Sequence, residues 1–152
     1  MKTILRHVFL ISFAGLAFTS NAAQFFQRKL NQWKDNKYEG LWISWSDSLK
    51  KNVESRGRYK NGQETGTWKF YYDDGTLRRR ERYSRHGIAT KYFYPNGKLK
   101  SKGKARLDYE EEFLHYYYQG DWTYYSEEGK PVQVITYDRG VETKSRFFGE
   151  SK

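Results

Sequence analysis

Few residues of this sequence could carry acid–base or metal chemistry, and they do not converge. The chain has three histidines, His7, His86 and His115, and no cysteine. His86 lies in the turn-like segment SRHG, and His115 follows Glu111 by four residues, a spacing that brings two side chains close together only in a helix. A zinc site needs three or four ligands, and no further histidine or cysteine completes a set. We therefore expect no metal.

The carboxylates are equally dispersed. Asp73, Asp74, Glu127 and Glu128 stand beside glycines in segments of turn composition, where acids mainly stabilise the turn itself. General acid–base catalysis needs two converging carboxylates or a histidine with a partner. No serine has a nucleophile-elbow context, and no glycine-rich phosphate loop opens a helix. The sequence therefore predicts no catalytic residue, no cofactor and no enzymatic activity.

The first 22 residues have the composition of a secretory signal peptide. Lys2 and Arg6 precede an apolar run from Val8 to Phe18, and Ser20-Asn21-Ala22 supplies a small-x-small cleavage site. A membrane-spanning helix needs roughly 20 apolar residues, which this run does not reach. No cysteine follows it for lipid attachment. We expect export to the periplasm or the medium, without a lipid anchor and without a transmembrane segment in the mature chain.

A ten-residue pattern recurs four times in the remaining chain. The copies start at residues 40, 66, 88 and 120 and read GLWISWSDSL, GTWKFYYDDG, IATKYFYPNG and GDWTYYSEEG. One position of the pattern holds Trp42, Trp68, Thr90 and Trp122. Another holds Trp45, Tyr71, Phe93 and Tyr125, which we call the aromatic row. The starts are 26, 22 and 32 residues apart, a period typical of small structural repeats.

Each copy reads as strand, turn, strand and turn. Asp74-Gly75, Asn96-Gly97 and Asn61-Gly62 are dipeptides that favour two-residue type I′ turns. The sequence thus predicts an all-β protein, an antiparallel meander of repeated hairpins. Copy one has Leu49 in place of the turn glycine, and copy three lacks both the first glycine and the tryptophan. We expect these two hairpins to be irregular.

The motif G-x-W-x-x-Y-Y-x-x-G-x-L, followed by Y-x-x-G, resembles the bacterial variant of the MORN repeat (membrane occupation and recognition nexus), found in proteins called YwqK-like antitoxins. The resemblance extends from about Tyr38 to Lys144. It implies a β-hairpin scaffold that binds proteins or lipids, and the family name implies an antitoxin or immunity role.

These features divide the chain into four parts. Residues 1–22 are the signal peptide, 23–38 a short helix or arm, 39–144 the repeat domain with an insertion at 107–119, and 145–152 a tail. Phe26, Leu30 and Trp33 have helical spacing. A helix here either packs over the sheet or lies on a membrane surface.

Pairing across the turns predicts one face rich in aromatic side chains and one rich in cations. With Phe70 opposite Arg79 and Tyr71 opposite Arg78, Trp68 and Tyr83 fall on the core side. The candidate binding residues on the other side are Arg56, Arg58, Lys69, Tyr71, Arg78, Arg80, Arg82, Lys91, Phe93, Lys100, Lys102 and Lys104. This face either binds an anionic partner or is a solvated face whose cations cover aromatic rings.

The insertion carries acids that continue the alternation of the basic strand. Asp108, Glu110 and Glu112 either neutralise the cations of a neighbouring strand or bind a basic partner. The formal net charge is +10, which attracts anionic partners. We therefore predict an exported, non-catalytic scaffold that binds another macromolecule, a protein first of all. Anionic envelope lipid or lipopolysaccharide is the alternative, and the signal peptide argues against nucleic acid.

Overall fold

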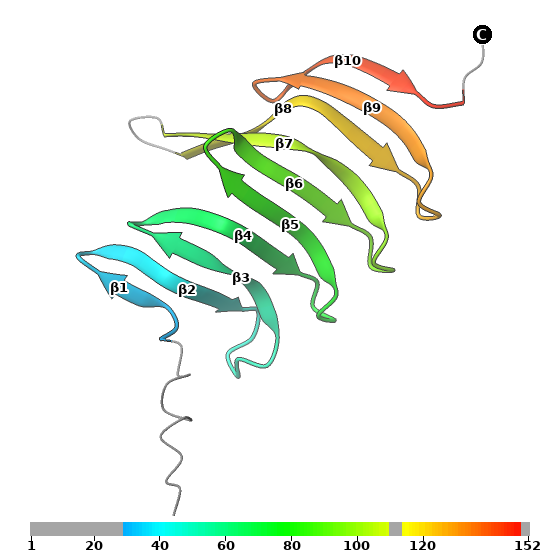
Figure 1. The fold of residues 1–152 in the computed structure, drawn as a ribbon. Helices are drawn as coiled ribbons and strands as arrows, with labels where there is room; N and C mark the ends of the chain where they lie inside the picture. The colour runs from blue at the N-terminus through cyan, green and yellow to red at the C-terminus, as the bar shows by residue number, and fades with distance from the viewer. Residues whose placement is uncertain (1–28, 110–113, 150–152) are drawn as a thin grey trace, which may run out of the picture.

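The computed structural model describes residues 29–109 and 114–149, with Tyr109 described in its backbone alone. Ten strands form one antiparallel sheet in which neighbours in the chain are neighbours in space (Figure 1). They are β1 (Gln32–Lys34), β2 (Lys37–Trp45), β3 (Val53–Lys60), β4 (Gln63–Tyr71), β5 (Leu77–Ser84), β6 (Gly87–Phe93), β7 (Leu99–Tyr109), β8 (Leu114–Tyr125), β9 (Pro131–Asp138) and β10 (Val141–Phe147). The predicted all-β meander is confirmed.

The helix considered for residues 23–38 is wrong for the part that the structure describes. Residues 32–34 form β1, which pairs with β2. The side chain of Asn31 bonds both the carbonyl oxygen and the N–H of Ile43, at 2.9 and 2.8 Å. Trp33 packs on Tyr38 with ring centroids 4.4 Å apart. These sheet contacts outweigh the local helical spacing, and residues 1–28, including the predicted signal peptide, lie outside the described part. None of the described residues forms a helix long and apolar enough to cross a membrane.

Turns of two kinds alternate along the meander. Asn61 and Gly62 both have positive φ, at 53° and 83°, so the type I′ turn predicted there is confirmed. At Asp74-Gly75 and Asn96-Gly97, however, the glycine alone has positive φ. Gly75 N–H donates to the Tyr72 carbonyl at 2.9 Å and Tyr72 N–H to that of Thr76 at 2.8 Å, the pattern of a type I turn with a glycine bulge. The type I′ prediction is wrong there, since Asp74 and Asn96 do not have positive φ. Their side chains instead accept from the N–H groups of Thr76 and Lys98, at 2.8 and 3.0 Å.

The core lies on one face, where tryptophans rest on glycines of the preceding strand. Trp122 is fully buried against Gly103, and Trp68 occupies the same position over Gly57. Each indole N–H donates to the backbone carbonyl one residue after that glycine, Trp122 to Lys104 at 3.0 Å and Trp68 to Arg58 at 3.1 Å. The pairing is bulged at both places.

The hairpin of copy three is built differently at this position. Thr90 replaces the tryptophan, and it lies directly opposite Glu81, which replaces the glycine. Each of the two side chains is 1% exposed. The pairing of β5 with β6 shows no register shift, unlike the pairings of β3 with β4 and of β7 with β8, so copy three departs from the other copies at the tryptophan position, whereas the shift beside its turn matches theirs. The expected irregularity is confirmed for copy one, where the Asp47 carboxylate organises the loop by accepting the N–H groups of Lys51 and Asn52.

Candidate binding face

Five of the predicted binding residues form a continuous row of direct partners across the sheet. The register pairs Arg56 with Lys69, Lys69 with Arg80, Arg80 with Lys91, and Lys91 with Lys102. Residues directly opposite in an antiparallel sheet share a face, and adjacent strands lie about 4.8 Å apart. This cationic row therefore runs through β3, β4, β5, β6 and β7 on the face opposite Trp68 and Trp122.

A second, sparser line of cations flanks the cationic row. Arg58, Arg82 and Lys104 lie two residues further along β3, β5 and β7. On the strands between them the equivalent positions hold the small residues Thr67 and Ala89, which pair with Arg82 and Lys104. Cations and small side chains thus alternate along this line.

Arg78 and Lys100 do not occupy the places predicted for them. Tyr71 pairs with Leu77 and Phe93 with Leu99, because the glycine turns introduce a register shift at each hairpin end. Arg78 and Lys100 are therefore the extra residues of two bulges and have no direct partner across the hairpin. The predicted pairing of Tyr71 with Arg78 is wrong, whereas that of Phe70 with Arg79 is confirmed.

Residues of the cationic row make the same cation–π contact with the aromatic row in three places. The Arg56 guanidinium lies 5.7 Å from the Tyr71 ring centroid, that of Arg80 lies 5.9 Å from Phe93, and the Lys102 ammonium lies 5.6 Å from Tyr125. Each contact joins one hairpin to the next. Such contacts are worth about 0.5–1 kcal/mol at exposed sites, so part of the positive charge stabilises the stack of hairpins.

No carboxylate neutralises the cationic row among the residues that the structure describes. Their ion pairs are Arg79 with Glu81 at 3.4 Å and Arg139 with Asp108 at 4.0 Å. Asp108 also accepts a hydrogen bond from the Tyr117 hydroxyl at 2.8 Å. Asp108 therefore neutralises a cation within the chain, but that cation is Arg139 after β9 rather than a member of the row. Glu110 and Glu112 lie outside the described residues.

A buried charged network on the opposite face was not predicted. Glu81 is 1% exposed and accepts hydrogen bonds from the hydroxyls of Tyr83 and Tyr116, at 3.1 and 3.0 Å. The guanidinium of its partner Arg79 stacks 3.9 Å from the Phe70 ring centroid. The signal was present in the alternation, which places Arg79, Glu81 and Tyr83 on the face of Trp68 and Phe70.

The environment of this network keeps its phenols protonated. Burial raises the pKa of Tyr83 and of Tyr116, and the Glu81 carboxylate raises both further. A phenol held neutral in this way is a poor general base. The arrangement therefore has the character of a structural core rather than of a catalytic centre.

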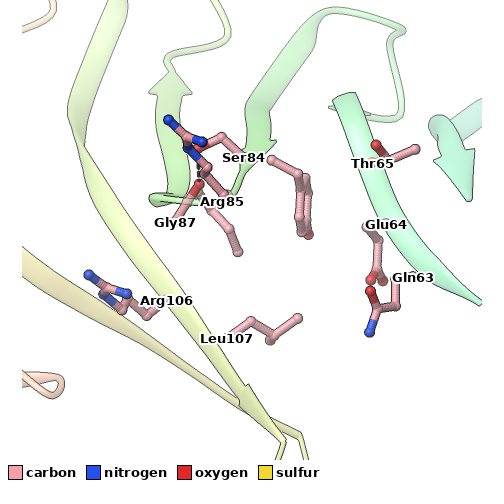
Figure 2. Close-up of a pocket in the computed structure, with 10 residues that line it drawn as sticks. Gln63, Glu64, Thr65, Ser84, Arg85, Gly87, Arg106 and Leu107 are labelled. Carbon is pink, nitrogen blue, oxygen red and sulfur yellow. Dashed lines mark hydrogen bonds between the residues drawn. The ribbon is translucent and has the colours of Figure 1, made fainter. Parts of the chain in front are cut away.

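A hollow of about 420 Å³ opens beside this network. Figure 2 shows Gln63 and Glu64 on β4 at one side, Arg106 and Leu107 on β7 at the other, and the turn between β5 and β6 between them. The Glu64 carboxylate is already engaged, since it accepts from the Tyr59 hydroxyl at 3.3 Å. Within residues 29–109 and 114–149, no three His, Cys, Asp or Glu side chains gather as metal ligands would.

Stacked antiparallel hairpins in one sheet, each nested on the one before, define a β-hairpin repeat protein. The family model of the MORN repeat variant matches three segments, residues 64–84, 85–104 and 118–139. The first corresponds to β4 and β5, the second to β6 and about the first half of β7, and the third to about the last two thirds of β8 with β9. No curated protein and no solved structure matches the chain significantly. MORN repeats are often binding or scaffold modules, which is compatible with a non-catalytic protein.

Proposed function

We propose that this chain is an exported, non-catalytic scaffold that binds an acidic partner protein through the cationic row and the aromatic row beside it. The observation that carries the proposal is the register, which places Arg56, Lys69, Arg80, Lys91 and Lys102 in line. Like charges directly opposite in a sheet are destabilising. An acidic surface bound over the row offsets this repulsion, because its carboxylates attract the cations.

The packing of the aromatic row favours a protein over a lipid surface. Tyr71, Phe93 and Tyr125 are half-buried, with cations above their rings. Membrane-surface binding normally inserts exposed apolar side chains into the acyl layer, and these rings are not free to do so. Arginine and tyrosine side by side are, in contrast, the residues enriched at the energetic centres of protein interfaces.

The experiment is an affinity capture with the full chain, tagged at its C-terminus and purified from the envelope fraction of expressing bacteria. The test variant is Arg80→Ser/Lys91→Ser/Lys102→Ser. The matched control is Lys34→Ser/Lys130→Ser/Lys144→Ser, which removes the same charge at exposed positions outside the cationic row. Envelope extract is applied at about 0.1 M and about 0.5 M salt, where the screening length falls from about 10 Å to about 4 Å.

We expect one protein with an acidic surface to be retained by the parent and the control at both salt concentrations, and to be lost with the row variant. Lipid or lipopolysaccharide retained only at low salt would replace the proposal with the envelope alternative. A captured toxin would specify an immunity role for the same face, as the antitoxin name implies. Equal capture by all three proteins would reduce the row to a solvated face.

Export is a separate part of the proposal and is supported by residues 1–22 alone. The expected result is a periplasmic or secreted protein whose measured mass corresponds to a chain beginning at Ala23. Recovery of the uncleaved chain in the cytoplasm would contradict this part and leave the binding proposal to be tested with cytoplasmic extract.

A further inference from the structure

Three hollows on the basic face lie at equivalent places in successive repeats. The three hollows measure about 460, 620 and 700 Å³. The first is lined on β3 by Arg56 and Arg58, the second on β5 by Arg80 and Arg82, and the third on β7 by Lys102 and Lys104. In every hollow, therefore, the central strand contributes two cations with one residue between them.

The side walls and floors of the hollows repeat as well. Lys69 of β4 lines the first and second hollows, and Lys91 of β6 lines the second and third. Thr67 and Ala89 also line two hollows each, and their short side chains leave the space open. The hollows thus form one interrupted groove across the sheet, with a lysine at each boundary.

The spacing of the hollows follows from the strands on which they are centred. β3, β5 and β7 are each two strands apart, and with about 4.8 Å per strand the hollows repeat every 9.6 Å or so. Acidic side chains on one face of a β-strand repeat about every 6.7 Å. On one face of an α-helix they repeat about every 5.4 Å, or about 10.5 Å when they are seven residues apart. A polyproline II segment returns to the same face every third residue, after about 9.3 Å.

We infer that the three hollows bind successive acidic side chains, three residues apart, of one extended polyproline II-like segment of the partner. This inference rests on the proposed function and specifies what the face recognises. The hollow over β5 is the strongest anion site, because Lys69, Arg80, Arg82 and Lys91 surround it without a carboxylate. The hollow over β7 is weaker, because Asp121, which accepts the Thr136 hydroxyl at 2.6 Å, lines it.

Two fluorescent peptides of identical composition test the spacing. One contains three Glu-Pro-Gln units in succession, and the other carries the same residues with its three glutamates adjacent. Binding of each to the full-length protein is followed by fluorescence anisotropy at about 0.1 M salt. We expect the spaced peptide to bind about tenfold more tightly, since three sites are engaged together rather than one.

A pair of single variants tests the place of binding. Arg82→Ser removes a cation of the β5 hollow that is not part of the cationic row, and Lys130→Ser removes an exposed cation of the turn before β9. We expect Arg82→Ser to weaken binding of the spaced peptide several-fold, towards that of the permuted peptide, and Lys130→Ser to leave its affinity within about twofold. Unchanged thermal unfolding of both variants establishes that their folds are intact.

Equal affinity for the two peptides would overturn the inference, as would equal effects of the two variants. If a partner is nevertheless captured through the cationic row, only the inference about the spacing of its acidic residues is refuted, and the proposed function stands. If neither peptide binds and nothing is captured, both fail.

Discussion

The indole of Trp122 lies directly over the backbone of Gly103, with no room between them for a Cβ atom. Trp68 and Gly57 form the same contact in the first half of the sheet. Each pair joins two consecutive hairpins, and each indole is held by its hydrogen bond to the carbonyl that follows the glycine. Although the protein is a single sheet, these contacts bury a tryptophan side chain between neighbouring hairpins.

Replacing Gly103 with alanine should destabilise the protein strongly, because the new Cβ overlaps the fully buried ring of Trp122. Overpacking of this kind costs about 1–3 kcal/mol or more. The free energy of unfolding in urea measures the loss. Thr67→Ala, at an exposed position of β4, is the control and should change stability by less than about 0.5 kcal/mol. A neutral Gly103→Ala would show that the nested contact does not hold the repeats together.

The hydroxyl of Tyr94 should be worth about 0.5–1.5 kcal/mol of stability. It donates to the carbonyl of Tyr125 in the next hairpin at 2.8 Å, as Tyr72 does to that of Phe93. Tyr94→Phe removes this hydrogen bond, so the Tyr125 carbonyl loses its hydroxyl donor. Tyr71→Phe is the matched control, since the Tyr71 hydroxyl has no hydrogen-bond partner among the described residues. Denaturation midpoints of the two variants give the comparison, and equal losses would contradict the role of the inter-hairpin bond.

Stability should fall as the pH rises above about 10, the pKa of an unfolded tyrosine. The pKa values of Tyr83 and Tyr116 are raised in the folded protein, by burial first and then by Glu81. Unfolding therefore releases protons in this range, and the stabilisation, complete below pH 10 or so, is lost as the pH approaches the folded values. Urea midpoints between about pH 8 and pH 11, with tyrosinate absorbance recorded in parallel, test this.

The double variant Tyr83→Phe/Tyr116→Phe is the control for the alkaline transition. It should reduce the pH dependence, although it is less stable at neutral pH because it removes two hydrogen bonds to the buried Glu81. An unaltered slope would place the responsible tyrosines elsewhere.

Neutralising the centre of the cationic row should separate stability from binding. In Lys91→Thr, the repulsion with Arg80 and Lys102 is removed, and at low salt the protein should gain about 0.2–1 kcal/mol while it loses affinity for its acidic partner. The gain should disappear at about 1 M salt, where the screening length is near 3 Å. Lys144→Thr on the edge strand β10 is the control. A destabilised Lys91→Thr would mean that the lysine stem contributes more by packing than its charge costs.

The repeat and the class of fold could be predicted because both depend on local patterns. Successive side chains of a strand point to opposite faces of the sheet, so residues two apart share a face. An Asn-Gly dipeptide favours a turn that involves only four residues. The register predicted for Lys69 with Arg80 was correct for this reason, and from it the composition of the basic face followed. Of the short helix or arm expected over residues 23–38, the helix is wrong for the described residues, because helical spacing of apolar side chains did not outweigh pairing with β2.

The tertiary structure decided how one hairpin meets the next. The register shifts beside the turns left Arg78 and Lys100 without the partners predicted for them, because a bulge places one extra residue in one strand of the pair. Between copies two and three, the contact of a tryptophan with a glycine is replaced by Thr90 opposite Glu81. The two residues belong to different copies, so neither copy alone reveals the pair. Glu81 is charged and reads as a surface residue, yet Tyr83, Tyr116 and Arg79 satisfy it in the core. The sequence by itself determined the strands after β1, the positions of the predicted turns and the charge of one face, whereas packing between repeats determined the alignment of that charge and the burial of Glu81.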